Sequence, residues 1–158
     1  ENLGGSTLPA LAGGSLTGIS AGKIGQVVTA NVGNSDITST SATYADLVTL
    51  NITPSATSST ILIYVLANYN LFGNNTTAEP EGYLALRDSS NNELTRGFTY
   101  DSFTNSSKQH DSGLNIHYLF SPNSTSQQTY KLSFKALSGG RFRIHYRPTR
   151  ITAMEILA

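Results

Sequence analysis

The residues Ile61-Leu62-Ile63-Tyr64-Val65-Leu66-Ala67 form an unbroken apolar run rich in β-branched and aromatic side chains, which favour a β-strand. Successive side chains of a strand point to opposite sides, so this strand, expected over residues 60–68, is apolar on both faces. In a lone antiparallel sandwich its outer face, formed by Leu62, Tyr64 and Leu66, would be an exposed apolar stripe. The run therefore predicts a strand whose outer face is covered by a partner subunit.

Other stretches alternate apolar and polar residues, which indicates strands with one packed and one wet face. The inward residues are Tyr130, Leu132 and Phe134 in one such stretch and Phe142, Ile144 and Tyr146 in another. Strands are expected at residues 24–30, 44–52, 60–68, 83–87, 94–100, 114–120, 129–137, 141–147 and 150–157, separated by clusters of Asn, Ser, Gly and Pro. Helical periodicity does not persist anywhere. The sequence predicts an all-β fold, an antiparallel β-sandwich or jelly roll.

The last expected strand, residues 150–157, is apolar on both sides apart from Glu155. Two readings fit this pattern. The strand either lies at a symmetry axis between subunits or is buried inside the monomer.

Composition restricts the function. The 158 residues suffice for one domain with its own core. Charged residues make up 13% of the chain and the formal net charge is zero, which argues against nucleic acid as a partner. The absence of cysteine excludes a disulfide framework, thiolate zinc sites and cysteine catalysis. No apolar run approaches the length of a membrane helix, so membrane insertion is not expected.

Residues 1–22 differ in composition from the rest of the chain. They contain six glycines and few large side chains, and they cannot bury enough apolar surface to fold alone. Regularly spaced apolar residues such as Leu8 and Leu11 make sense if the segment packs in an oligomer or against the body. A linker is the alternative. We therefore expect an N-terminal segment at 1–22 and a β-sandwich head at 23–158.

Several short motifs resemble a known family. They are Leu8-Pro9-Ala10-Leu11, Gly22-Lys23-Ile24-Gly25-Gln26-Val27-Val28, Ser41-Ala42-Thr43-Tyr44-Ala45-Asp46 and Ile151-Thr152-Ala153-Met154-Glu155-Ile156. Together they resemble the C-terminal receptor-binding heads of bacteriophage tail fibres, outside about residues 71–112. The resemblance implies a trimeric jelly roll at the distal end of a fibre in the virion, attached to an upstream shaft. It also implies adhesion to a host cell-surface polysaccharide or lipopolysaccharide.

Two other classes compete with this resemblance. A structural virion protein, such as a capsid decoration protein or head-fibre knob, shares the trimeric β architecture and needs no receptor. The carbohydrate-binding module of a secreted bacterial enzyme is the third class, and the absence of tryptophan counts against it.

Receptor contacts are expected on two aromatic and polar segments, residues 69–81 and 100–111, which are interpreted as loops on a rigid scaffold. Their aromatic, amide and acidic groups suit a neutral sugar, although some of the rings could be core. The candidate residues are Tyr69, Asn70, Phe72, Asn74, Asn75, Tyr100, Asp101, Phe103 and Asn105.

A basic face is the alternative receptor site. If residues 129–137 and 141–147 form a hairpin, their outward side chains make one basic sheet that suits the phosphates and carboxylates of lipopolysaccharide. These side chains are Lys131, Lys135, Arg141, Arg143 and Arg147. Contact with the acidic middle of a neighbouring subunit is the competing interpretation.

Catalytic and metal-binding patterns are missing from the sequence. His110, His117 and His145 lack the spacing of a metal site, and Glu79 and Glu81 flank a proline in a polar stretch. We find no motif for nucleophilic catalysis, phosphate binding or dinucleotide binding. The sequence therefore predicts a protein that is not an enzyme and needs no cofactor.

Overall fold

The computed structural model describes residues 23–73, 79–101, 109–137 and 140–157. The N-terminal segment 1–22, with Leu8 and Leu11, lies outside the described residues, so its expected packing stays a prediction. Within the described ranges every regular element is a β-strand. That part of the chain has no helix long and apolar enough to cross a membrane.

The nine strands of the described residues follow one another along the chain. They are β1 (Lys23–Asn31), β2 (Ile37–Ser39), β3 (Ala45–Ile52), β4 (Thr60–Gly73), β5 (Glu81–Asp88), β6 (Glu93–Tyr100), β7 (Gln109–Phe120), β8 (Gln128–Ala136) and β9 (Gly140–Leu157). The short strand β2 was not expected. Strand β4 ends at Gly73 and not at residue 68, and β7 begins at Gln109 and not at residue 114.

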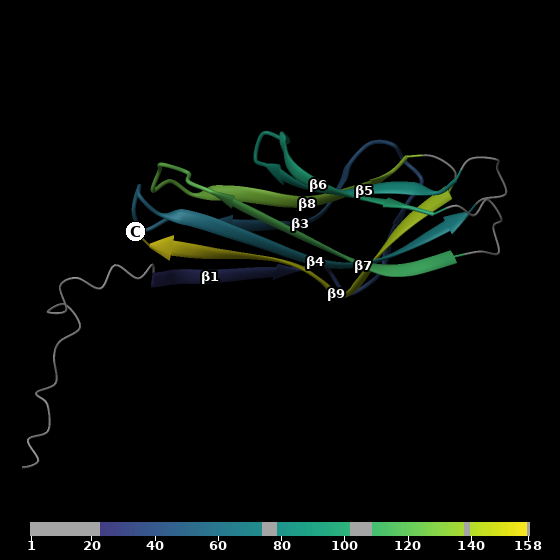
Figure 1. Cartoon of the computed structure of the whole chain (residues 1–158), viewed down its shortest axis with the longest axis horizontal. Coiled ribbons are helices and arrows are strands. Elements are labelled where there is room, and N and C mark those ends of the chain that lie inside the picture. Colours follow the sequence, from purple (N-terminus) through teal and green to yellow (C-terminus); the bar gives the residue numbers. More distant parts are fainter. Residues whose placement is uncertain (1–22, 74–78, 102–108, 138–139, 158) are drawn as a thin grey trace, which may run out of the picture.

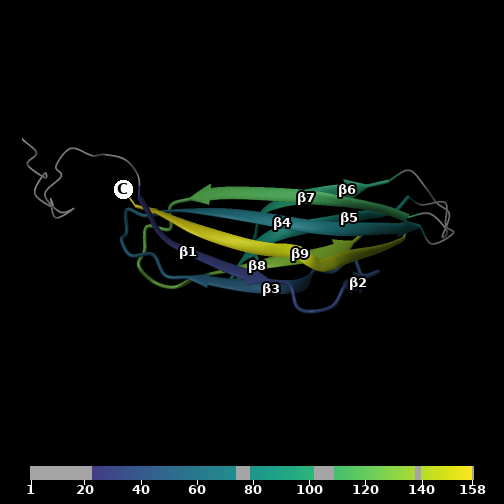
Figure 2. The same cartoon turned by 90° about the horizontal axis from the view of Figure 1, so that it is seen from below.

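Two antiparallel sheets form the fold. Sheet A has the order β1-β9-β4-β7, with β2 also paired to β9, and sheet B has the order β3-β8-β5-β6. Figure 1 shows the two sheets as stacked layers, and Figure 2 shows sheet A with its strands side by side. The predicted antiparallel β-sandwich of jelly-roll type is thus confirmed.

The core lies between the two layers. Strand β4 sends Ile61, Ile63 and Val65 into it, each with no exposed surface. The inward sets expected from alternation are confirmed for Tyr130, Leu132, Phe134, Phe142 and Ile144, which are all buried. A Cβ atom on Gly82 of β5 would lie 2.5 Å from the Phe142 ring, so glycine permits close approach of the two sheets there.

Two expected strands, 141–147 and 150–157, are one bent strand, β9. Its pairing with β4 shifts between Leu66↔Arg150 and Asn68↔His145, so four residues of β9 lie opposite one residue of β4. Pro148 falls in this bulge, as expected for a residue without a backbone N–H. Beyond the bulge, β9 lies between β1 and β4 of its own sheet, with Ile151 and Ala153 buried in the monomer core.

Glu155 is a buried carboxylate on the inner side of β9, with 1% of its surface exposed. Its Oε1 atom accepts hydrogen bonds from the Ser55 backbone N–H at 2.6 Å, the Ser55 hydroxyl at 2.7 Å and the Ser59 hydroxyl at 2.6 Å. Its Oε2 atom accepts one from Gln26 Nε2 at 2.8 Å. Glu155 thereby fastens the β3–β4 connection and β1 to β9 at one end of the sandwich.

Burial opposes ionisation of Glu155, but the hydrogen bonds from Ser59, Gln26 and Ser55 favour the charged form and lower its pKa to about 2 from 4.5. Because the pKa is lower in the folded chain than in the unfolded chain, the carboxylate stabilises the fold fully above pH 4.5. That contribution is lost as the pH falls towards 2.

We predict that Glu155→Gln lowers the free energy of unfolding at pH 7 by about 1–3 kcal/mol, because an amide nitrogen cannot accept the hydrogen bonds of a carboxylate oxygen. Urea unfolding at pH 7, 4 and 3 measures this. The variant should also lose part of the acid sensitivity of the parent chain. Glu93→Gln, at an exposed carboxylate that accepts a hydrogen bond from Tyr44, is the control and should lower the free energy of unfolding less. Equal effects of the two substitutions would contradict the role assigned to Glu155.

Candidate functional site

The outer face of sheet A has an apolar half. Cross-strand pairing places Val27, Met154, Leu62 and Leu119 in one row across β1, β9, β4 and β7. Val27 and Leu119 are 57% and 59% exposed. We define the apolar half-face as this row together with three neighbours on the same side of the sheet, which are Ile24, Tyr64 and Ile156. The expected outward orientation of Leu62, Tyr64 and Leu66 is confirmed by the burial pattern of β4.

The other half of the same face is polar and carries several predicted receptor residues. Asn70 and Phe72 lie on β4, not in a loop, and both are nearly buried. The guanidinium groups of Arg141 and Arg143 stack on the Phe72 ring at 4.5 and 4.4 Å. Tyr69 points the other way and packs edge-on against Phe142 in the core. The loop interpretation is wrong for these three residues because β4 continues to Gly73, where it pairs with the start of β9.

His145 lies between two carboxylates in this polar half. Its Nδ1 is 3.1 Å from Asp36 Oδ2 and its Nε2 is 3.1 Å from Asp111 Oδ1. A hydrogen bond from Asn70 Nδ2, together with the contact to His145, lowers the pKa of Asp111. Among the described residues no cluster of three acidic or histidine side chains is arranged to hold a metal ion.

The single basic sheet expected from a β8–β9 hairpin is not formed. Strand β8 pairs with β3 and β5 in sheet B, whereas β9 belongs to sheet A. Lys131 and Lys135 therefore lie on one outer face of the sandwich, and Arg141 and Arg143 lie on the opposite one. The side chain of Arg147 lies outside the described residues.

The outer face of sheet B carries a row of aromatic rings, which we call the aromatic strip. It consists of Tyr83, Phe98 and Tyr100, with ring centroids 5.2 Å apart for the first pair and 6.4 Å for the second. Phe98 and Tyr100 are 52% and 47% exposed. The guanidinium of Arg96 lies 4.3 Å from the Tyr83 ring centre, and Lys135 Nζ lies 5.4 Å from it. These contacts cover Tyr83 and leave Phe98 and Tyr100 as a solvent-facing platform.

Carboxylates border the Tyr100 end of the aromatic strip. The Tyr100 hydroxyl donates a hydrogen bond to Glu79, and this bond raises the pKa of the phenol. Glu81 lies opposite Tyr100 in the β5–β6 pairing, and Asp101 follows it in the chain and contacts His110. Of the predicted receptor residues, Tyr100 thus belongs to this surface, while Asp101 follows the end of β6 and contacts His110 of sheet A.

Other candidates cannot be placed, and two residues were missed. Asn74, Asn75, Phe103 and Asn105 lie outside the described residues. The candidate receptor residues chosen from the sequence did not include Tyr83 or Phe98. The alternation Phe98-Thr99-Tyr100, with Thr99 buried, is the signal that places both rings outward.

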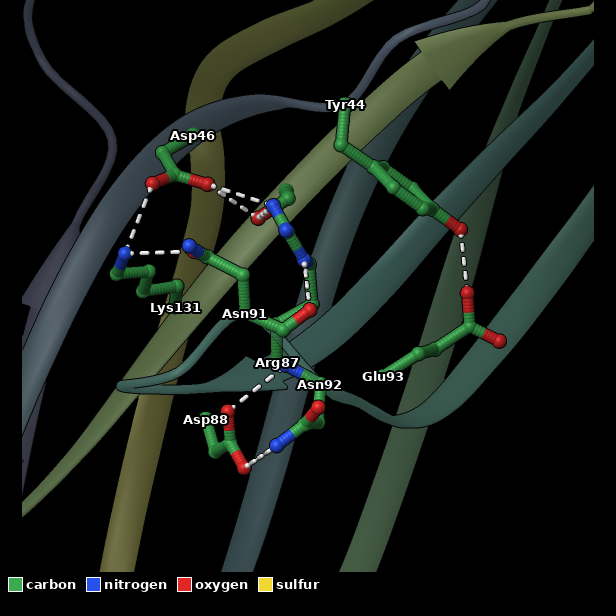
Figure 3. A network of polar contacts seen from close by, with 9 residues as sticks. Tyr44, Asp46, Arg87, Asp88, Asn91, Asn92, Glu93 and Lys131 are labelled. Carbon is green, nitrogen blue, oxygen red and sulfur yellow. Dashed lines mark hydrogen bonds and ion pairs between the residues drawn. The ribbon is translucent and has the colours of Figure 1, made fainter.

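A polar network joins the strands of sheet B (Figure 3). Asp46 of β3 accepts a hydrogen bond from the Ser133 hydroxyl at 2.6 Å and pairs with Arg87 at 3.3 Å and with Lys131 at 3.5 Å. Arg87 and Lys131 also donate to oxygens of Asn91, which occupies the left-handed region at φ 68° in the β5–β6 turn. The network therefore joins β3, β5 and β8 to the β5–β6 hairpin.

Tyr44 extends the network towards β6. Its hydroxyl donates to Glu93 at 2.7 Å, and burial together with this hydrogen bond raises its pKa to about 12. Lys135 Nζ lies 4.5 Å from the centre of the Tyr44 ring as well as near Tyr83. The aromatic strip is thus fixed to a rigid sheet instead of a loop.

The topology and the two-layer packing define a jelly-roll domain. The chain is similar to the Eiger TNF from S. frugiperda, with a TM-score of 0.55, 9% identity, and coverage of 86% of this chain and 94% of that one. This likeness bears on the fold alone. A weaker likeness links the chain to VP2 of infectious bursal disease virus, with a TM-score of 0.36, 13% identity, and coverage of 84% of this chain and 38% of that one. No family model and no curated protein matches the sequence.

We predict that Asp46→Ala lowers the free energy of unfolding by about 1–3 kcal/mol, since it leaves the buried Ser133 hydroxyl without its acceptor and removes the carboxylate partner of the largely buried Arg87 guanidinium. Asp46→Asn keeps one acceptor oxygen and should cost less. Thermal or urea unfolding of both variants measures the difference. If Asp46→Ala unfolds like the parent chain, the network does not hold the strands together.

Proposed function

We propose that the chain is the receptor-binding head of a bacteriophage tail fibre, located at the distal end of the fibre in the virion. The head acts by adhesion and not by catalysis, and it needs no cofactor. The shaft of the fibre lies upstream of the head. The sequence motifs at both ends of the chain support this proposal through their resemblance to such heads. The jelly-roll fold is compatible with it.

The observation that carries the receptor-binding part of the proposal is the exposed pair of rings of Phe98 and Tyr100. Apolar C–H faces of sugars stack on aromatic rings, and adjacent polar groups bind the hydroxyls. Here the rings lie beside the carboxylates of Glu79 and Glu81 and the guanidinium of Arg96. The receptor that fits this surface is a host cell-surface polysaccharide, or the sugar part of a lipopolysaccharide.

The apolar half-face supports self-association, and the resemblance to fibre heads implies three copies. Its side chains form a contiguous apolar area on the outside of sheet A, and such an area on a soluble protein marks an interaction surface. A self-associating jelly roll buries this area against copies of itself and leaves the aromatic strip, on the opposite sheet, accessible. Three equivalent glycan sites then add avidity to weak single contacts.

We predict that Leu62→Lys converts the assembly into monomers, because it places a charge at the centre of the apolar row, where desolvation without a partner costs several kcal/mol. Multi-angle light scattering of the purified chain gives the mass. Thr49→Lys, on the exposed outer side of sheet B, is the matched control and should stay trimeric. A monomer mass for the parent chain at every concentration would contradict the proposed trimer.

We predict that Phe98→Ala weakens adsorption to host cells about tenfold or more, which corresponds to losing roughly 1.4 kcal/mol of stacking per site. Because the ring is half exposed, the melting temperature and the trimer mass should hardly change. Binding of fluorescently labelled protein to intact cells is the measurement.

The double variant Arg141→Ala with Arg143→Ala tests the competing receptor face on sheet A. If it abolishes adsorption while Phe98→Ala has no effect, the polar half of sheet A is the receptor surface. If the parent trimer ignores host cells and binds capsids, the chain is a structural virion protein and the adhesin proposal fails.

A further inference from the structure

Two arginines on the outside of sheet A share one aromatic ring. The guanidinium carbons of Arg141 and Arg143 lie 4.5 and 4.4 Å from the centre of the Phe72 ring, so they are at most about 9 Å from each other. The ring is 7% exposed, whereas Arg141 is exposed and Arg143 keeps 31% of its side-chain surface. The nearly buried ring therefore holds two cations close together at the surface.

The N–H groups of both arginines are available to a ligand. Stacking uses the flat face of a guanidinium and leaves its N–H groups free at the edge. Within the described part of the chain, neither Arg141 nor Arg143 donates a hydrogen bond to the protein, and Arg141 has no ion pair. The ion pair of Arg143 is with Asp36, at 3.8 Å, which is longer than a hydrogen bond. Two like charges this close repel, and an anion bound between them removes the repulsion.

The carboxylates around this pair of arginines are engaged elsewhere. Asp111 accepts a hydrogen bond from Asn70 Nδ2 at 2.6 Å, and its Oδ1 lies 3.1 Å from Nε2 of His145. Asp36 Oδ2 lies 3.1 Å from the other ring nitrogen of His145. Both carboxylates thus face His145, and neither accepts a hydrogen bond from the guanidinium groups.

Uncharged donors lie beside the arginines. Thr38 of β2 is opposite Arg143, and Gln109 of β7 is opposite Phe72, so both side chains are on the outer side of sheet A, where both residues are exposed. Strand β4 ends and β9 begins here. Strand β1 begins and β9 ends at the opposite end of the sandwich (Figure 1). The site is therefore remote from the end at which the described chain begins.

We propose that Arg141 and Arg143 bind the phosphate monoester group of a phosphorylated sugar. Such a group carries roughly two negative charges near neutral pH and three acceptor oxygens, so it accepts hydrogen bonds from both guanidinium forks at once. A guanidinium carbon lies roughly 4 Å from the phosphorus of the phosphate that it binds, so one phosphate joins two such carbons up to roughly 8 Å apart. The Phe72 ring keeps the two carbons in about this range. A planar carboxylate matches one fork alone, so phosphate is preferred over a uronic acid. This site is separate from the proposed receptor surface on sheet B.

The test is an NMR titration of the whole chain in a phosphate-free buffer at constant ionic strength. The probes are glucose 6-phosphate, glucuronate and glucose, which carry a phosphate, a carboxylate and no charge. We expect saturable shifts of the Phe72 ring and the Thr38 amide with glucose 6-phosphate and none with glucose. Glucuronate should bind about tenfold more weakly because it engages one fork. Absence of saturation with glucose 6-phosphate, or equal affinity for glucuronate, contradicts the proposal.

Variants identify the groups that bind the phosphate. Arg141→Ala should weaken binding of glucose 6-phosphate about tenfold, and Arg141→Lys should give an intermediate affinity because lysine keeps the charge but lacks the fork. Arg150→Ala is the matched control, since it removes an exposed arginine from the outer side of the same strand, opposite Leu66 and beyond the bulge. Its affinity should equal that of the parent chain, and urea unfolding verifies that each variant is folded. Equal affinities of Arg141→Ala and the parent chain overturn the proposal, and so does an equal loss in Arg150→Ala.

A second experiment distinguishes a phosphosugar of a cell surface from a soluble one. Binding of the chain to lipopolysaccharide vesicles is measured before and after treatment with a phosphatase. Binding that falls after the treatment and in Arg141→Ala assigns the phosphate to the cell surface. Binding of glucose 6-phosphate without any effect of the phosphatase assigns it to a soluble sugar. Adsorption that depends on Phe98 without binding of glucose 6-phosphate contradicts this proposal alone, and the reverse result contradicts the receptor surface alone.

Discussion

The fold depends on covering both sides of β4. This strand pairs along nearly its whole length with β7 on one side and β9 on the other, so its backbone is satisfied within sheet A. Its inner side chains form the middle of the core together with sheet B. The outer side chains change from apolar to polar along the strand, from Leu62 and Tyr64 to Asn68 and Asn70. That change divides the outside of sheet A into an apolar half and a polar half.

The alternation of apolar and polar residues predicted where most of the strands and most of the core lie, but it missed the short strand β2 and the full lengths of β4 and β7. It failed at the turn near residues 138–140, which was interpreted as part of a hairpin. Strands on either side of a hairpin pair within one sheet, but Phe134 of β8 and Phe142 of β9 instead face each other across the sandwich, with ring centroids 5.8 Å apart. A short connection and two alternating strands do not distinguish a hairpin from a crossing between sheets. The packing of the apolar faces of β8 and β9 against each other decides between the two arrangements.

The candidate sites were less predictable for a related reason. Aromatic residues of the stretch 69–72 look like loop residues because polar residues separate them, yet the same spacing places Tyr69 in the core and Phe72 beneath two arginines. Phe98 and Tyr100 form a platform because Tyr83 lies beside them on the neighbouring strand, and strand neighbours are not visible in a single sequence. The buried hydroxyl of Tyr130, which has no hydrogen-bond partner among the described residues, is likewise a property of packing, since alternation predicts its burial but not its missing partner.

The two outer faces differ in the way their charges are balanced, and this has consequences for binding. On sheet B, the cations Arg87, Arg96 and Lys131 are paired with carboxylates or stacked on aromatic rings, so they leave little unbalanced positive charge. A ligand bound to this face would be held by stacking and hydrogen bonds, which salt does not screen strongly. On sheet A, Arg141 and Arg143 share one ring, and within the described part of the chain Arg143 pairs with Asp36 whereas Arg141 has no ion pair. Binding there would depend on charge and would weaken with ionic strength. The dependence of a ligand's affinity on salt concentration thus identifies the face to which the ligand binds.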